Sequence, residues 1–538
     1  MAGACAPRRL SRASESRPRG PGTRDSLPHI AASFRVRKEV SVLAATAATL
    51  VASLTTVPVE GFAAGLAGVE WLEVRADMAG DLDPAALRRQ FPGKLLYTLR
   101  SRAEGGVFEG SPERRKRRLL EAARVYDRVD LEAARDLAPD LLDAIAAERR
   151  LISWHGPACD LGALEACFAR MAAVEAALYK LVPTAAQPGE ELPPLLLLAA
   201  LSRRDVVAFA AGAAGAWTRL VAPRLGAPVV FGAAGGVPAA AGQMAIHTLR
   251  EDYGLPALPP VAKLFGIVGN PVVHSLSPRL HNGAYAALGI PALYLPFEAG
   301  SFGDFWLEVV ESGALEALGL PIHGLSITAP FKEAALAVAG AESPRAGRIG
   351  AANTLVCNQG VWEAESTDPE GVVLPLAERG IGIAGRRAAV VGAGGAGRSA
   401  ALGLALAGAD VTLVNRGRER GEQAAGALGL SFLPLARFVP AAFDLLVNAT
   451  PLGRSAADPL PFAVDSLRPG TVVVDLVYGD RPTPLLAAAA ALGIVAVDGR
   501  EVLLAQALGQ FRMMTGRELP VDLARRLLGL AAPAGAAA

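Results

Sequence analysis

Two lysines stand out among the residues of this chain that could do covalent or proton-transfer chemistry. The sequence holds only six lysines against 47 arginines, so arginine is its usual cation. A guanidinium keeps its proton at working pH, whereas an amine can lose it and attack a carbonyl carbon. Lys180 lies in the apolar stretch 177–182, where burial would lower the pKa of its amine. Lys332 follows Pro330 at an expected helix start. A cation is mildly disfavoured at a helix N-terminus, so its presence there indicates a functional role.

His155 could complete the chemistry of such an amine. An imine between Lys180 and a ketone withdraws electrons and acidifies the proton on the neighbouring carbon. An imidazole with a pKa of about 6.5 can remove that proton and later protonate a leaving hydroxyl. Further polar side chains end or follow short β-prone runs, although a single strand-end residue is more often solvated or salt-bridged. They are Glu73, Arg75, Arg100, Glu104, Glu132, Arg219 and Gln243.

The elements that would position these side chains alternate regularly. From about residue 45 to residue 255, short β-prone runs alternate with stretches of helical period. Eight parallel strands, each followed by a helix, predict a (β/α)8 TIM barrel, whose active site lies at the C-terminal ends of its strands. The polar residues would then meet at one mouth. The runs are 49–55, 69–74, 94–99, 128–132, 151–154, 177–182, 205–210 and 228–231.

The first run has a competing interpretation. The basic residues 35–38 precede an uncharged stretch at 40–59, which resembles the n-region and h-region of a signal sequence. Its Thr and Ser residues and Pro58 make it a poor membrane helix, so we favour a first barrel strand. A signal segment here would leave the barrel one strand short.

A glycine-rich turn in the second half has the context of a dinucleotide site. It lies between a strand at 387–391 and a helix that runs through residue 404, with a second strand at 410–414. This βαβ order lets backbone N–H groups and a helix N-terminus hold a pyrophosphate. The four glycines of the turn are Gly392, Gly394, Gly395 and Gly397.

The tip of the second strand indicates which dinucleotide binds. An NAD enzyme would place an acid there to accept the ribose hydroxyls. This chain has Asn-Arg-Gly-Arg-Glu-Arg at 415–420 instead. Guanidinium groups suit a 2′-phosphate, so we expect NADP(H) as the cofactor.

Composition limits the class of protein. The chain has 538 residues, 52% hydrophobic and 20% charged, which predicts two to four packed domains. A net charge of +1 argues against a nucleic-acid partner. Four scattered cysteines without a CxxC pair indicate neither a disulfide framework nor a metal site. We expect no membrane partner, and a monomer or a homodimer.

The first 38 residues differ from the rest. They carry nine Lys and Arg against two acids and have no apolar periodicity, so we expect a disordered head. A cytoplasmic location is expected, or a plastid if this head is a transit peptide.

Five ordered motifs resemble those of type I 3-dehydroquinate dehydratases over roughly residues 45–253. The motifs are Leu-Glu-Val-Arg-Ala-Asp at 72–77, Thr-Leu-Arg-Ser-Arg-Ala-Glu-Gly-Gly at 98–106, Ser-Trp-His at 153–155, Tyr-Lys at 179–180 and Gly-Gln at 242–243. The resemblance implies a Schiff base between Lys180 and the C3 ketone of the substrate. It also implies that His155 is the general base and acid and that Glu104 orients it. The implied substrate-binding residues are Glu73, Arg75, Arg100, Arg219 and Gln243.

Two positions depart from that family. Gly156 follows the histidine where the family usually has Asp or Asn, and Ala239 stands where the lid usually carries a Ser. Losing a hydroxyl contact can cost about 1–3 kcal/mol in binding. A weakened or metabolite-sensing barrel is therefore the alternative to an active dehydratase.

From residue 263 to about residue 530 the chain resembles shikimate dehydrogenases. The motifs include Ser-Leu-Ser-Pro at 275–278, Ser-Ile-Thr-Ala-Pro-Phe-Lys at 326–332, Ala-Ala-Asn-Thr at 351–354, Thr-Asp at 367–368, Asn-Ala-Thr-Pro at 448–451 and Asp-Leu-Val-Tyr at 475–478. The resemblance implies that Lys332 and Asp368 relay a proton to the ketone oxygen during reduction by NADPH. The implied substrate-binding residues are Ser275, Ser277, Thr328, Asn353, Tyr478 and Gln506, and the implied cofactor-binding residues are the four glycines with Asn415, Arg416, Arg420 and Thr450.

The two halves have consecutive chemistry, because the product of the dehydratase is the ketone that the dehydrogenase reduces. The chain thus resembles bifunctional fusions that catalyse two steps of the shikimate pathway towards aromatic amino acids. The alternatives are a quinate dehydrogenase and a non-catalytic sensor barrel. The expected organisation is a head at 1–44, a barrel at 45–254, a linker at 255–262, a substrate-binding lobe at 263–370 completed by about 507–530, and a Rossmann domain at 371–506.

Overall fold

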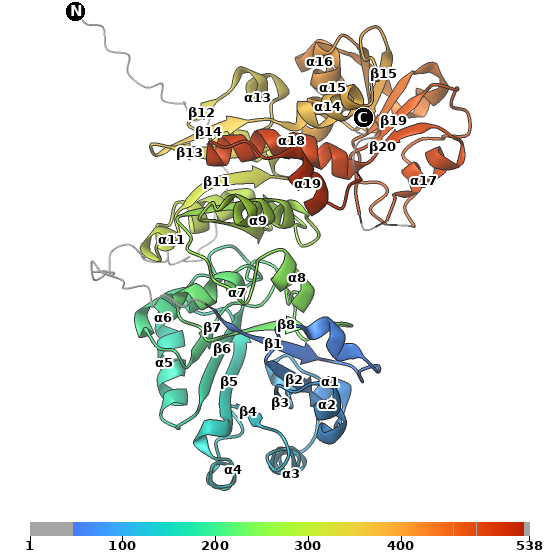
Figure 1. The fold of residues 1–538 in the computed structure, drawn as a ribbon. Coiled ribbons are helices and arrows are strands. Elements are labelled where there is room, and N and C mark those ends of the chain that lie inside the picture. Colours follow the sequence, from blue (N-terminus) through green and yellow to red (C-terminus); the bar gives the residue numbers. More distant parts are fainter. Residues whose placement is uncertain (1–46, 456, 480, 532–538) are drawn as a thin grey trace, which may run out of the picture.

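The structure is a computed structural model that describes residues 47–455, 457–479 and 481–531 (Figure 1). The basic head expected at residues 1–44 lies outside the described residues. Figure 1 shows the first half of the chain as a lower body, with the two lobes of the second half above it.

The first half forms the predicted barrel. Its eight parallel strands have the spatial order β7-β6-β5-β4-β3-β2-β1-β8. Leu, Val and Ala fill them and are buried, as parallel strands covered by helices require. The strands are β1 (Thr49–Leu54), β2 (Trp71–Arg75), β3 (Lys94–Thr98), β4 (Arg128–Glu132), β5 (Arg150–Pro157), β6 (Leu178–Thr184), β7 (Val206–Ala208) and β8 (Val229–Ala233).

The expectation that residues 49–55 begin the barrel is confirmed. β1 pairs with β2 on one side and with β8 on the other, so the first strand of the barrel is hydrogen-bonded to the last. The sheet therefore curls round on itself, which places the C-terminal ends of the strands on one face.

The helices of the barrel begin at signals that can be read in the sequence. Asp83, Ser111 and Asp160 each accept a backbone N–H at a helix start. The helices are α1 (Ala76–Ala79), α2 (Pro84–Gln90), α3 (Pro112–Ala122), α4 (Pro139–Ala144), α5 (Leu161–Ala172), α6 (Pro193–Leu201), α7 (Thr218–Val221) and α8 (Ile246–Glu251), with a short 3-10 turn η3 at Arg102–Glu104.

The second half begins with a mixed six-stranded sheet of order β10-β9-β11-β13-β14-β12. Its strands are β9 (Lys263–Gly269), β10 (Ala292–Glu298), β11 (Ile322–Ile327), β12 (Ala341–Glu342), β13 (Thr354–Asn358) and β14 (Val361–Glu365). Its helical elements are α9 (Ser277–Leu288), α10 (Phe302–Phe305), the π-helix η6 (Trp306–Val310), α11 (Ala314–Ala317), α12 (Lys332–Val338) and α13 (Pro344–Ile349).

A second six-stranded sheet follows, with all strands parallel in the order β17-β16-β15-β18-β19-β20. This is the strand order of a dinucleotide-binding Rossmann domain, whose ligand lies where the order reverses between β15 and β18. The strands are β15 (Arg387–Val391), β16 (Asp410–Asn415), β17 (Ser431–Pro434), β18 (Leu445–Asn448), β19 (Val472–Asp475) and β20 (Val495–Val497). Its helices are α14 (Asp368–Glu378), α15 (Gly395–Leu406), α16 (Arg418–Leu428) and α17 (Pro484–Ala491).

The last two helices return to the first lobe of the second half. They are α18 (Gly499–Thr515) and α19 (Val521–Leu527), and α18 lies across both lobes in Figure 1. The expected domain boundary at residue 506 falls inside α18, so this helix belongs to both lobes.

The linker packs against the barrel. The Ala48 N–H donates to the Pro256 carbonyl over 2.9 Å, and Leu258 is buried. Across the joint, the Trp217 ring lies 5.2 Å from the Phe297 ring, and Arg279 pairs with Asp252 over 2.7 Å. The two halves therefore meet through buried apolar side chains. Within the described residues, the helices are too short or too polar to cross a membrane.

Candidate active sites

The barrel mouth holds an amine among charged groups. Lys180 on β6 is only 6% exposed, and its nitrogen lies 4.0 Å from the centre of the Phe231 ring. Burial lowers the pKa of Lys180; the carboxylate of Glu73 opposes that shift and the guanidinium of Arg100 adds to it. The amine is therefore unprotonated more often than that of a surface lysine, which suits attack on a carbonyl.

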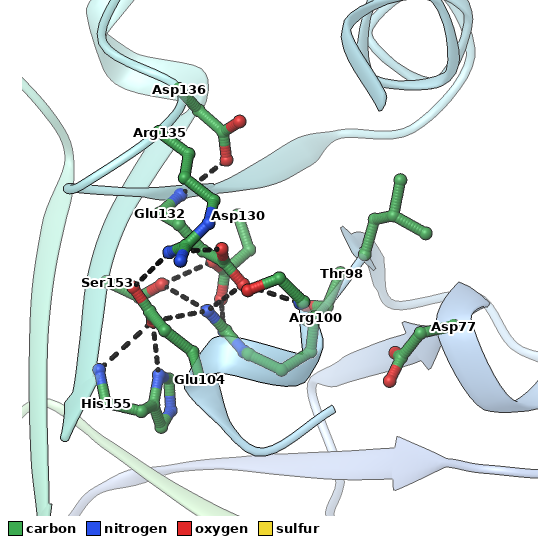
Figure 2. A network of polar contacts seen from close by, with 12 residues as sticks. Asp77, Thr98, Arg100, Glu104, Asp130, Glu132, Arg135, Asp136, Ser153 and His155 are labelled. Atoms are coloured by element: carbon green, nitrogen blue, oxygen red, sulfur yellow. Dashed lines mark hydrogen bonds and ion pairs between the residues drawn. The ribbon is translucent and has the colours of Figure 1, made fainter. Parts of the chain in front are cut away.

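His155 lies on the neighbouring strand β5, two positions after Ser153, the residue paired with Lys180. An oxygen of Glu104 lies 3.2 Å from His155 Nδ1 and also accepts the His155 backbone N–H over 3.1 Å, as Figure 2 shows. Burial and the nearby cations, Arg100 first, lower the pKa of His155 well below its usual 6.5. The imidazole is therefore neutral at neutral pH and can accept a proton.

Arg100 organises the wall behind this pair (Figure 2). One terminal nitrogen donates to Asp130 over 2.7 Å, and the other donates to Ser153 over 2.8 Å. The second nitrogen also lies 3.2 Å from Glu104 and 3.3 Å from Glu132. Because both terminal nitrogens are committed to protein oxygens and the residue is buried, Arg100 orders the carboxylates around the mouth.

Glu73 is held ionised on the other side of the mouth. Ser53 and Thr98 donate hydroxyl hydrogen bonds of 2.5 and 2.9 Å to its two carboxylate oxygens. Burial opposes ionisation, but the charges of Lys180 and Arg75 and the two hydroxyls outweigh it and lower the Glu73 pKa. A carboxylate here can balance a positive charge on the nitrogen of Lys180.

The lid of the mouth is anchored through its backbone. The Ala239 N–H donates to Gln243 Oε1 over 2.7 Å, and the Ala239 carbonyl accepts from Arg75 over 2.9 Å. Gln243 in turn donates to Ser53 over 3.1 Å. These contacts hold the lid segment at the mouth although the chain lacks a serine at position 239.

The second departure, Gly156, also has a physical reason. A Cβ atom at this position would lie 2.3 Å from the ring of Trp154. The indole therefore occupies the space that an Asp or Asn side chain would need.

Arg219 offers donors to a ligand in the barrel. It is 2% exposed, and one terminal nitrogen donates to the Phe231 carbonyl over 3.1 Å. Its Nε and Nη2 atoms have no hydrogen-bond partner among the described residues. Burial lowers the Arg219 pKa to about 10, so the group stays charged at neutral pH. Because the Phe231 ring contacts Lys180, these donors lie in the same part of the barrel.

Sequence reasoning missed several residues of this site. Ser53, Thr98, Asp130 and Ser153 are buried and bonded to predicted site residues. Asp130 and Ser153 lie two positions before Glu132 and His155, so strand alternation places each pair on the same face. That period-two signal could have found them.

The buried Glu104 predicts a pH-dependent stability. Burial is the main cause that raises its pKa from 4.5 to about 7; Arg100 opposes it, and Glu132 and Asp130 reinforce it. A folded-state pKa above the unfolded value makes folding take up a proton. The contribution to the free energy of unfolding is therefore full below pH 4.5 and is lost as pH rises to about 7. Glu104→Gln should remove this loss, which is about 3 kcal/mol for such a shift.

The measurement is the unfolding midpoint temperature at pH 5, 6, 7 and 8. We expect wild type to fall more between pH 5 and pH 8 than Glu104→Gln does. Glu121→Gln, which changes an exposed carboxylate on α3, is the matched control and should keep the wild-type pH dependence. Equal pH dependence for Glu104→Gln and wild type would contradict the assignment.

The cleft of the second half contains the other predicted pair. Lys332 begins α12, and its nitrogen donates to a carboxylate oxygen of Asp368 at the start of α14. Both side chains are about 15% exposed, at 15% and 14%, so a small ligand can reach them. The pair joins the two lobes, because α12 belongs to the first lobe and α14 leads into the Rossmann domain.

Asn353 connects this pair to α18. Its amide donates to Asp368 over 2.8 Å and to Gln506 over 3.0 Å. Gln510 holds Asn353 from behind by donating to its backbone carbonyl over 2.9 Å. The sequence did not single out Gln510, although it lies four positions after Gln506 and so on the same face of α18.

Of the remaining predicted substrate residues, Ser275, Ser277 and Thr328 lie in the first lobe, and Tyr478 follows β19 of the Rossmann domain. The Ser277 N–H donates to Ser275 Oγ over 3.2 Å, and the Thr328 N–H donates to the Val268 carbonyl over 2.9 Å. Tyr478 also contacts Ser275, and burial raises the Tyr478 pKa, so its hydroxyl stays protonated. Ser275, Thr328 and Tyr478 are partly exposed, whereas Ser277 is buried.

The glycine loop between β15 and α15 fits a dinucleotide. A Cβ at Gly397 would lie 1.9 Å from the Gly392 carbonyl, and Gly392 itself has a φ of 116°, so both positions require glycine. A Cβ at Gly394 would meet nothing within 4 Å. The loop therefore faces open space at Gly394, where a pyrophosphate can approach the backbone N–H groups. At Gly395 a Cβ would lie 3.0 Å from the Lys332 Cβ, so the pair of Lys332 and Asp368 neighbours this loop.

The basic turn after β16 is tied to the same loop. Asn415 accepts the Ala393 N–H over 3.3 Å and donates to the Gly417 carbonyl over 2.9 Å. Arg416 is exposed, whereas Arg420 pairs with Glu333 over 2.9 Å. On the adjacent loop after β18, Thr450 donates to Asn448 over 2.7 Å. The structure thus brings the predicted cofactor residues together at the C-terminal ends of β15, β16 and β18.

Comparison with known families assigns a family to each half of the chain. Residues 59–257 match the type I 3-dehydroquinase model, and residues 267–355 match the shikimate dehydrogenase substrate binding domain. Residues 387–445 match an FAD binding domain model, over the glycine-rich βαβ segment that flavin and nicotinamide proteins share.

Individual relatives match the second half. The chain is 38% identical over 270 residues to shikimate dehydrogenase (NADP(+)) from Halobacterium salinarum, covering 49% of this chain and 98% of the relative. It is 40% identical over 279 residues to the Moorella thermoacetica enzyme of the same name, covering 49% and 92%. A solved structure of dehydroquinate dehydratase and shikimate dehydrogenase from S. pombe covers 90% of this chain and 98% of its own, at 23% identity and a TM-score of 0.41, a likeness too weak to identify a function. The chain belongs to the shikimate dehydrogenase family and carries a type I 3-dehydroquinase domain in front of it.

Proposed function

We propose that this chain catalyses two consecutive reactions of the shikimate pathway. The barrel dehydrates 3-dehydroquinate to 3-dehydroshikimate, and the second half reduces 3-dehydroshikimate to shikimate with NADPH. One observation carries the proposal: a buried amine beside a neutral imidazole, and a Lys-Asp pair beside a dinucleotide loop, occur in one chain. The two families that match the halves support it.

In the barrel, the unprotonated amine of Lys180 attacks the C3 ketone, water leaves, and the resulting imine takes up one proton, which gives an iminium ion; the final hydrolysis releases that proton again. The iminium withdraws electrons from the neighbouring carbon and acidifies its proton. Neutral His155 takes that proton and then returns it to the departing hydroxyl, so base and acid are one group. Hydrolysis of the remaining iminium releases 3-dehydroshikimate and restores the amine.

The other residues of the mouth position these two groups. Glu104 fixes the His155 ring through Nδ1 and stabilises the imidazolium that forms during proton transfer. The two donors of Arg219 that have no partner among the described residues would bind the substrate carboxylate. Gln243, anchored to the lid, would bind a substrate hydroxyl.

In the second half, Lys332 donates a proton to the ketone oxygen. Asp368 holds the ammonium in place and shares its proton. Asn353 and Gln506, which are bonded to each other, would hold ring hydroxyls of the substrate. NADPH, when bound, supplies the hydride for this reduction.

The residues present fit NADP(H). The glycine loop would hold the pyrophosphate, while Arg416 and Arg420 would hold the 2′-phosphate. Since no acid of the NAD type follows β16 and the relatives are NADP(+) enzymes by name, we favour NADP(H) over NAD and over FAD.

The proposal is tested by assaying each half separately. Purified protein with 3-dehydroquinate alone should form the conjugated enone, and with 3-dehydroshikimate and NADPH it should oxidise the cofactor. The same protein is then assayed with quinate and shikimate, each with NADP+ and NAD+. Faster oxidation of quinate than of shikimate would assign the second half to quinate instead, and ketone binding without enone formation would make the barrel a sensor.

A further inference from the structure

Glu333 lies between two arginines of the Rossmann domain. One of its carboxylate oxygens accepts from Arg398 on α15 over 2.6 Å and from Arg420 on α16 over 2.9 Å. Glu333 itself is the second residue of α12, in the other lobe. A single carboxylate thus joins the lobe that carries Lys332 to two cations at the dinucleotide site.

The two arginines are not equivalent. The Arg398 side chain is only 15% exposed and also donates to the Gly350 carbonyl over 3.5 Å, so it is held in place. The Arg420 side chain is 62% exposed and lies five positions after Asn415, in the first turn of α16, close to where a 2′-phosphate is expected. Arg420 can therefore exchange partners, whereas Arg398 stays with Glu333.

The position of Glu333 connects this exchange to the catalytic helix. Its neighbour Lys332 packs against Gly395 of the glycine loop and is bonded to Asp368. A partner change at Arg420 therefore acts on the contact between α12 and the Rossmann domain.

We propose that Glu333 competes with the 2′-phosphate of NADP(H) for Arg420 and so determines how strongly the chain prefers NADP(H) over NAD(H). This inference rests on the proposed function of the second half. A phosphate carries more charge than a carboxylate and offers three acceptor oxygens, so it displaces Glu333 from Arg420. NAD(H) lacks that group and leaves the ion pair intact. Glu333 thus lowers the affinity for NADP(H) alone.

The effect should be moderate, because exposed ion pairs contribute little to stability. We expect Glu333→Gln to tighten NADP+ binding about fivefold at low ionic strength and to change NAD+ binding less than twofold. At high salt, where exposed charges are screened, the gain for NADP+ should shrink.

The test is the dissociation constant of NADP+ and of NAD+ by isothermal titration calorimetry on the full chain. Glu518→Gln is the matched control, since it also removes an exposed carboxylate paired with an arginine, Arg512, and should change neither constant. In an Arg420→Gln background, Glu333→Gln should no longer affect NADP+. This dependence on Arg420 distinguishes competition between Glu333 and the 2′-phosphate from a general effect of removing one negative charge.

Three results would overturn the inference. They are an unchanged NADP+ constant in Glu333→Gln, an equal change for NADP+ and NAD+, and a persisting effect without Arg420. In each case, if wild type still bound NADP+ more tightly than NAD+, the proposed function of the second half would remain supported. If wild type bound NADP+ and NAD+ equally, the inference on Glu333 and the proposed use of NADP(H) would both be contradicted.

Discussion

Replacing Lys180 by methionine should abolish the dehydration of 3-dehydroquinate, with a loss of at least about a thousandfold in kcat. Methionine fills a similar volume but has no amine, so no iminium can form and the proton on the neighbouring carbon stays unactivated. The barrel should remain folded, because methionine occupies the same space and Glu73 keeps its hydrogen bonds to Ser53 and Thr98.

Borohydride trapping makes this prediction specific. Wild type incubated with 3-dehydroquinate and then reduced should gain one substrate adduct at Lys180, and Lys180→Met should gain none. Lys116→Met is the control, because Lys116 is a partly exposed lysine on α3 that pairs with Asp140 on α4. Reduction of 3-dehydroshikimate should continue in both variants. An adduct at a different lysine, or normal dehydration by Lys180→Met, would contradict the assigned nucleophile.

Replacing Lys332 by methionine should lower kcat for 3-dehydroshikimate reduction by about a hundred- to ten-thousandfold, the usual range for a lost general acid. The ketone oxygen would then receive its proton from water. The dehydratase activity should be unaffected, and borohydride trapping at Lys180 should persist. Lys180→Met and Lys332→Met should therefore each remove the activity of one half and leave that of the other.

Lys332→Arg sharpens this prediction. Arginine can keep a bond to Asp368, but its guanidinium does not give up a proton at working pH. A slow Lys332→Arg enzyme with unchanged NADP+ binding would assign proton donation to the lysine. If kcat of Lys332→Arg were within tenfold of wild type, Lys332 would be only a structural partner of Asp368 and not the proton donor.

Local patterns predicted the elements well. The runs 128–132 and 387–391 match β4 and β15 at both ends, because the Val, Leu and Ala residues of each run are buried in a parallel sheet. The prediction at 205–210 was too long, since β7 covers only Val206–Ala208. There the N–H and carbonyl of Ala210 bond to the side chain of Thr218 instead of a neighbouring strand.

Contacts between site residues that are distant in the sequence were harder to predict. Strand-end position placed Lys180, His155 and Glu104 at one mouth, and the structure joins His155 to Glu104 as expected. The contact of Glu333 with Arg420 depends on how two lobes pack, which no local pattern encodes. Sequence therefore assigned Arg420 to the cofactor but could not reveal its partner in the other lobe.

A single-vessel assay that starts from 3-dehydroquinate and NADPH tests both reactions of the chain in one measurement. Wild type should oxidise NADPH and accumulate shikimate. Lys180→Met should do neither from 3-dehydroquinate and yet reduce added 3-dehydroshikimate at the wild-type rate. If wild type left NADPH unoxidised with 3-dehydroquinate, or if Lys180→Met still produced shikimate from it, two consecutive reactions on this chain would be ruled out.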